Sequence, residues 1–231
     1  GSRTLKALLA LTMSSNTNFI GQFIFGTSVA ATVGKGIIQP EFATTEVILA
    51  GLIGAIVWNL ITWYFGLPSS SSHALIGGLI GSALISGGIQ AIVFEGLEKT
   101  IVFMVASPAL GFFMAFILAI LLVYFLKRKK PRSINKVFGK LQICSSIFFS
   151  LTHGANDGQK TMGVITALLI AGGFLESTEF VVPIWVILSA AIAIGLGTFF
   201  GGWRIVKTMA FKLTDLKPVS YTHLTLPTTS R

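Results

Sequence analysis

The sequence has few charged residues. They make up 11% of its 231 residues, whereas a soluble domain has roughly 25%. Acidic residues are the scarcer kind, with 8 Asp and Glu against 17 Lys and Arg. A net charge of +9 can indicate a nucleic-acid-binding protein, but these basic residues cluster between long apolar runs. The composition therefore excludes an ordinary soluble globular protein, and the charge pattern indicates membrane topology without a nucleic-acid partner.

Cysteine is almost absent. The chain has a single one, Cys144, so it cannot form an internal disulfide. Disulfide-stabilised folds are excluded, and we expect the stability of the chain to come from packing within lipid.

Long apolar runs are abundant. A membrane-spanning helix needs about 20 mostly apolar residues, and four regions qualify: Val47–Phe94, Ile101–Leu126, Leu141–Gly173 and Pro183–Trp203. The first is interrupted by GLPSSSSH and the third by THGANDGQKT. These runs predict an all-α integral membrane protein with several spans, located in the cell membrane and surrounded by lipid.

The loop charges predict the orientation. Residues 127–140 carry seven basic residues and no acidic one, which is typical of a cytoplasmic loop. The turn inside Val47–Phe94 has no Lys or Arg. This region could cross the membrane twice or form a re-entrant hairpin, since both paths return the chain to the side it left. The absence of Lys and Arg at the turn favours the hairpin.

The turn Gly66–His73 is the first candidate site. Pro68 disfavours helix at Leu67, so the preceding helix should end there. The serines that follow are good N-caps for a helix beginning near His73. Hydroxyl groups beside the free N–H groups of a helix start can bind an anion, which makes the four serine hydroxyls of residues 69–72 a candidate anion site. A solvated, serine-rich loop is the alternative.

The second candidate site is the segment His153–Lys160. Asp157 is the only acidic residue within the apolar segments, and a carboxylate there is costly unless compensated. Gly154 and Gly158 would allow an unwound stretch, which predicts a broken helix. Oxygen atoms of Asn156 and Asp157 would then suit a small hard cation such as sodium. The alternative is a purely internal ion pair between Asp157 and Lys160.

Two stretches carry a resemblance to a known family. IVWNLITWYFGLPSSSSHALIGGLIG and SLTHGANDGQKTMGVI resemble the most diagnostic segments of the inorganic phosphate transporter family, which includes bacterial low-affinity permeases that move phosphate with a coupling cation. GLGTFFGGWRIVKT extends the resemblance, which covers roughly residues 25–220. It implies an inverted-repeat architecture, each half with one Gly-Asn-Asp motif and one serine hairpin, of which this sequence shows one each.

The resemblance also implies roles for the site residues. It assigns phosphate binding to Ser70, Ser71, Ser72 and His73, and the coupling ion, sodium or proton, to Asn156 and Asp157. His153 and Lys160 are auxiliary residues; for His153, both a structural hydrogen bond and a role in positioning the loop or carrying a proton stay open. No cofactor, resident metal or catalytic residue is implied, so the expected function is cation-coupled phosphate symport and not an enzyme activity.

The apolar runs, the basic loop and the resemblance together divide the chain into five parts. Residues 25–126 form the first-repeat membrane region and 141–212 the second, joined by the basic loop 127–140. We expect residues 1–24 to be a truncated remnant and 213–231 to be a tail outside the membrane whose last part is not native sequence.

Other functions stay open at this stage. Serine and histidine in interrupted apolar helices are compatible with an intramembrane serine hydrolase, although no serine stands out as the nucleophile. An anion channel, or a transporter of another tetrahedral oxyanion such as sulfate or molybdate, would use similar ligands. A homo-oligomer is equally compatible with the sequence.

Overall fold

The computed structural model describes residues 5–127, 131–175 and 180–208. These ranges contain seven α-helices and no β-strand: α1 Ala7–Ile24, α2 Ser28–Lys35, α3 Thr45–Phe65, α4 Ser71–Gly87, α5 Phe94–Leu126, α6 Pro131–Ala171 and α7 Ile184–Thr208. Two short 3-10 helices, Pro40–Phe42 and Gly88–Ala91, complete them. The predicted all-α fold is confirmed. The predicted tail 213–231 and part of the basic loop lie outside the described residues.

Four of the described helices are long and apolar enough to cross a membrane. They are Thr45–Phe65, Ser71–Ala91, Phe94–Leu126 and Ile184–Thr208, the second including the 3-10 turn after α4. They cover three of the four predicted apolar regions, Val47–Phe94, Ile101–Leu126 and Pro183–Trp203. The fourth, Leu141–Gly173, lies in α6, which is not among these four helices. The chain is a multi-pass membrane protein. The most apolar of them, α5, has a mean hydropathy of 2.7 and no buried residue.

Helices α3 and α4 form the predicted hairpin. Helix α3 ends at Phe65 and is capped by Gly66, whose φ of 69° is left-handed and suits glycine. Helix α4 begins after Ser70, whose Oγ accepts a hydrogen bond from the His73 backbone N–H at 3.3 Å. The helix end before Pro68 and the serine N-cap are thus confirmed, because both depend on local backbone chemistry.

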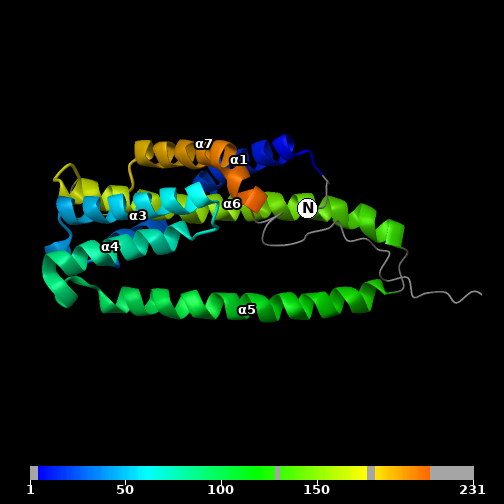
Figure 1. Cartoon of the computed structure of the whole chain (residues 1–231), viewed down its shortest axis with the longest axis horizontal. Helices are drawn as coiled ribbons and strands as arrows, with labels where there is room; N and C mark the ends of the chain where they lie inside the picture. The colour runs from blue at the N-terminus through cyan, green and yellow to red at the C-terminus, as the bar shows by residue number, and fades with distance from the viewer. Residues whose placement is uncertain (1–4, 128–130, 176–179, 209–231) are drawn as a thin grey trace, which may run out of the picture.

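The tip of the hairpin stops part-way along α5 and α6, as Figure 1 shows. This position agrees with a hairpin that enters the membrane and returns. Each arm, however, spans 21 residues, or about 30 Å at 1.5 Å per residue, which would suffice for a full crossing. The re-entrant path therefore stays a prediction.

Helix α6 contradicts the predicted broken helix. It runs through 41 residues from Pro131 to Ala171, including Gly154 and Gly158, with no unwound stretch. The two glycines serve helix packing instead: a Cβ at Gly154 would overlap the backbone of Asn18, and one at Gly158 would overlap the Gln22 side chain. Small residues let membrane helices approach closely, so here the glycines bring α1 against α6.

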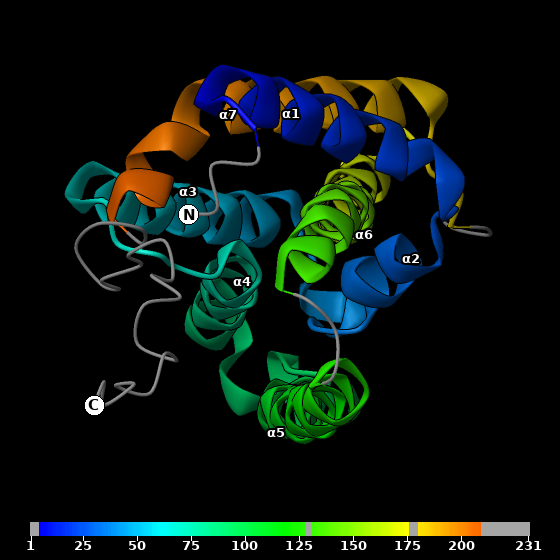
Figure 2. The ribbon, with the colours of Figure 1, turned by 90° about the vertical axis from the view of Figure 1, so that its right-hand side faces the viewer.

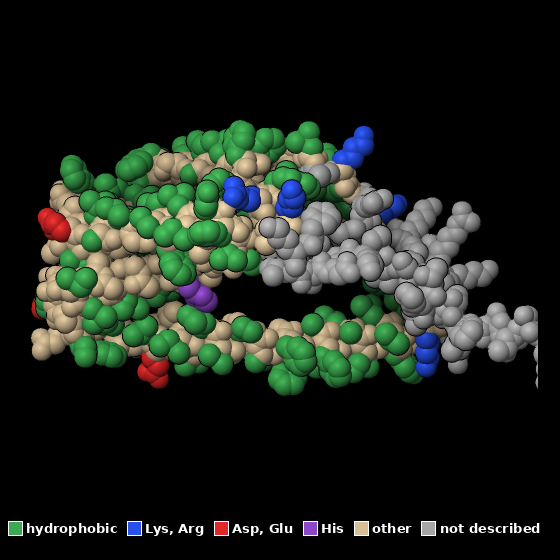
Figure 3. Space-filling view, in the orientation of Figure 1, with side chains coloured by type: hydrophobic (Ala, Val, Ile, Leu, Met, Phe, Trp, Pro, Cys, Tyr) green, Lys and Arg blue, Asp and Glu red, His purple; other side chains and the backbone are tan. Residues whose placement is uncertain are grey.

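Helix α6 is surrounded by α1, α2, α7 and the α3–α4 hairpin. Figure 2, which looks along α6, shows α1 and α7 above it, α2 on one side and the α3–α4 hairpin on the other. Buried polar side chains join α1 to α6 and α7, as in the hydrogen bond from Asn18 Nδ2 to Thr198 Oγ1 at 2.9 Å. Beyond its first turns, helix α5 is separated from the other helices by a hollow in the space-filling view of Figure 3.

Candidate functional site

The tip of the α3–α4 hairpin meets the middle of α6. The Ser71 Oγ donates a hydrogen bond to Asp157 Oδ2 at 3.3 Å. The Lys160 ammonium lies 2.5 Å from the Ser72 Oγ and 3.3 Å from Asp157 Oδ1. The two sequence motifs, more than 80 residues apart, therefore form one polar site.

Helical spacing places the polar residues of α6 on one face. His153, Asp157 and Lys160 are separated by four and three residues, so their side chains lie above one another on a continuous helix. The His153 Nε2 is 3.6 Å from Asp157 Oδ2, and its ring stacks on Phe149. The Asp157 carboxylate is thus surrounded by a hydroxyl, an ammonium and an imidazole.

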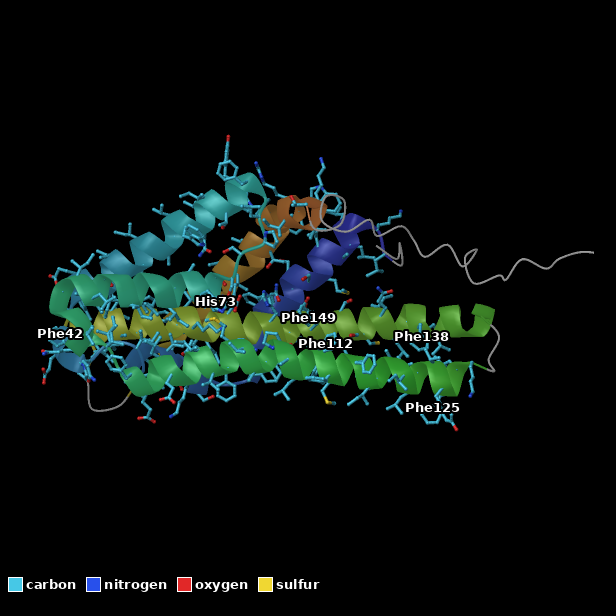
Figure 4. The ribbon with its side chains drawn as sticks, turned by 60° about the horizontal axis from the view of Figure 1, so that its bottom comes forward. Phe42, His73, Phe112, Phe125, Phe138 and Phe149 are labelled. Atoms are coloured by element: carbon cyan, nitrogen blue, oxygen red, sulfur yellow. The ribbon has the colours of Figure 1, made fainter. Side chains whose placement is uncertain are left out.

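Ser70 and His73 lie on the side of the tip that faces α3. With Ser69, they line an open groove of about 480 Å³ along α3 and α4, beside Trp58 and three glycines; Figure 4 labels His73 at the start of α4. The Ser70 Oγ caps the helix. Of the four predicted phosphate ligands, the structure therefore brings Ser71 and Ser72 to α6 and places Ser70 and His73 at the adjoining groove.

Asn156 differs in exposure from Asp157, with which it was predicted to bind the coupling ion. It is exposed, whereas Asp157 is part-buried. In the described part of the chain, the hydrogen bonds that join α6 to the hairpin tip come from Asp157 and Lys160. The contact of Lys160 with Ser72 of the other motif is what sequence reasoning missed. It considered Lys160 chiefly as the i, i+3 partner of Asp157, a pair that is also present.

The site can hold charges of both signs. The first turn of α4 provides free N–H groups and the positive end of the helix dipole next to the two serine hydroxyls, which favours an anion. Lys160 adds a positive charge at the same place. The Asp157 carboxylate and the hydroxyl oxygens are hard ligands that suit a small cation.

Among the described residues, no serine of the turn is hydrogen-bonded to a histidine ring, the pair on which the serine hydrolase alternative was based. Within the described residues, Ser71 is bonded to Asp157 and Ser72 to Lys160, while Ser70 is bonded to the His73 backbone. A serine nucleophile activated by histidine requires the imidazole within hydrogen-bond reach of its hydroxyl. The described geometry does not favour that alternative.

The chain is similar to several transporters. A sequence model described as the Phosphate transporter family matches residues 1–223. A probable low-affinity inorganic phosphate transporter of Rhizobium meliloti is 48% identical, over 94% of this chain and 65% of that protein. One of Mycobacterium bovis is 41% identical, over 94% of this chain and 52% of that protein. The chain thus spans between about half and two thirds of these relatives.

A solved structure shares the fold. The chain named "The sodium-dependent phosphate transporter" superposes with a TM-score of 0.80 at 23% identity, covering 90% of this chain and 70% of that one. The fold, the family match and the identity to the relatives agree. The protein is accordingly a multi-pass membrane protein that belongs to the phosphate transporter family, a family of transporters and not of enzymes.

Proposed function

We propose that this chain contains the substrate and coupling-ion site of a transporter that moves inorganic phosphate together with a cation. The observation that carries the proposal is the contact between the serine turn and α6, in which Ser71 and Ser72 meet Asp157 and Lys160. Ligands for an anion and for a cation are adjacent there. Opposite charges held side by side in a low-dielectric cavity strengthen each other's binding.

Phosphate would bind at the start of α4. The hydroxyls of Ser70, Ser71 and Ser72, the N–H groups behind them and His73 can surround a tetrahedral oxyanion. Hydrogen bonds to a charged group contribute about 1.5–3 kcal/mol each. Several of them would offset the cost of removing phosphate from water.

The coupling cation would bind at Asp157. Its carboxylate oxygens and the Ser71 hydroxyl are within reach of one another. Asn156, the other predicted ligand, is exposed on another side of α6, so the cation site that we propose rests on Asp157. The name of the similar structure includes sodium, which supports sodium; a proton taken up by Asp157 or His153 is the other candidate. No further cofactor is needed.

The test is phosphate uptake by the full-length protein in proteoliposomes. We expect saturable uptake of radioactive phosphate that requires an inward gradient of sodium or of protons. Equal uptake without either gradient would identify an anion channel instead. Stronger inhibition by sulfate or molybdate than by unlabelled phosphate would identify another oxyanion as the substrate.

A further inference from the structure

Lys160 occupies a position that the proposed binding of both ions would disturb. Its ammonium lies between Ser72, a proposed phosphate ligand, and Asp157, the proposed cation ligand, at 2.5 and 3.3 Å. The side chains of Lys160 and Asp157 are 27% and 23% exposed. The pair is therefore partly shielded from water but still open to a small ion.

The ammonium group of lysine is itself a monovalent cation on a flexible stem. While it is bonded to Asp157 Oδ1, it neutralises the carboxylate that a coupling cation would need. A cation arriving at Asp157 would compete with it for the same oxygen. The displaced ammonium would then lack a carboxylate partner and would remain beside the serines.

We propose that Lys160 is a tethered competitor of the coupling cation and becomes a phosphate ligand once that cation displaces it. This inference rests on the proposed function and adds a coupling device to it. Cation binding at Asp157 releases a positive charge toward Ser71 and Ser72, where phosphate binds. By linkage, bound phosphate holds Lys160 away from Asp157 and strengthens cation binding by the same factor.

A second lysine pair shows what a simple ion pair looks like in this chain. Lys99 and Glu95 on α5 are 2.6 Å apart and 67% and 77% exposed. Such an exposed i, i+4 pair contributes little to stability. Lys160 instead shares its ammonium between a hydroxyl of the hairpin and a carboxylate of α6, with the longer distance on the carboxylate side.

The first test measures coupling in the full-length protein. Phosphate KM is measured at several cation concentrations for wild type, Lys160→Gln, Lys160→Arg and the control Lys99→Gln. For wild type and the control, we expect saturating cation to lower the phosphate KM by about fivefold or more, and for Lys160→Gln by less than about twofold. Lys160→Gln should also raise the phosphate KM about tenfold and lower the half-saturating cation concentration. Lys160→Arg, which keeps the charge, should retain most of the coupling.

An unchanged coupling factor in Lys160→Gln would overturn the inference, because a static partner of Asp157 does not transmit cation binding to phosphate. The proposed function would survive that result, since wild-type uptake would still depend on the cation. Absence of cation-dependent phosphate uptake in wild type would overturn both.

The second test needs no variant. Acetylation of the wild-type protein by a small amine reagent is followed by mass spectrometry at Lys160 and Lys99. We expect the coupling cation alone to increase modification of Lys160 and added phosphate to reverse the increase, while Lys99 responds to neither. Modification of Lys160 that ignores the cation would contradict displacement.

Discussion

Helix α6 has two very different interfaces. Against α1, it packs through Gly154 and Gly158 so closely that an added methyl group would overlap its neighbour, and the amides of Asn18 and Gln22 are buried there. Against the tip of the α3–α4 hairpin, it makes polar contacts from side chains that are about one quarter exposed. The interface with α1 is close-packed and rigid. The interface with the hairpin tip can exchange its contacts for contacts with an ion.

The difference assigns distinct roles to the two interfaces. Close-packed interiors resist small changes in volume, so substitutions on the α1 side should reduce stability. Polar contacts that water can replace contribute less to folding, so substitutions on the hairpin side should change ion binding and leave the fold intact.

The largest expected effect concerns the hairpin side. Replacing both Ser71 and Ser72 by Ala removes two hydroxyls, each worth about 1.5–3 kcal/mol as a donor to a charged group, and should therefore raise the phosphate KM at least a hundredfold. The measurement is phosphate uptake in proteoliposomes. Ser82→Ala is the matched control, because the Ser82 hydroxyl donates to the Leu79 carbonyl within α4; equal effects of the two changes would contradict the site.

The next largest effect is a loss of stability at the interface between α1 and α6. Gly154→Ala forces a methyl group against the Asn18 backbone and should reduce the free energy of unfolding by about 1–3 kcal/mol. Thermal unfolding of the purified protein measures it. Gly77→Ala is the control, because nothing lies within 4 Å of the added Cβ. If Gly154→Ala were as stable as Gly77→Ala, the close packing of α1 on α6 would be refuted.

The smallest effect is expected where α7 contacts the end of α3, next to the hairpin tip. The Arg204 guanidinium donates to the Tyr64 carbonyl and lies 5.2 Å from the centre of the Trp63 ring. An exposed cation–π contact is worth about 0.5–1 kcal/mol, so Arg204→Gln should raise the phosphate KM only severalfold by loosening the end of α3. Lys207→Gln, on the same turn of α7, should change neither KM nor thermal stability; a full loss of uptake in Arg204→Gln would mean that Arg204 contacts the ions directly.

Sequence reasoning worked best where the chemistry is local. The helix end before Pro68 and the Ser70 cap follow from the conformational limits of single residues, and the structure contains both. The apolar spans follow from length and composition alone. The meeting of the two motifs could not be derived this way, because it depends on how distant helices pack.

The broken helix shows why local reasoning failed elsewhere. Glycine costs a helix roughly 1 kcal/mol relative to alanine, which suggested unwinding at Gly154 and Gly158. The close contacts with α1 outweigh that cost. Helix α1 was itself hard to recognise, because it carries buried polar residues such as Asn18 and Gln22 in place of a continuous apolar run.

The central claim is that the hairpin tip and α6 together bind an anion and a cation, with Asp157 holding the cation. The most direct test titrates phosphate uptake against cation concentration in proteoliposomes of the full-length protein carrying Asp157→Asn, with Glu95→Gln on α5 as the control. The substitution removes one negative charge while keeping a similar shape. We predict that Asp157→Asn weakens the cation dependence and that Glu95→Gln leaves it unchanged. Wild-type rates and an unchanged cation dependence in Asp157→Asn would contradict the account and leave Asp157 as a structural partner of Lys160.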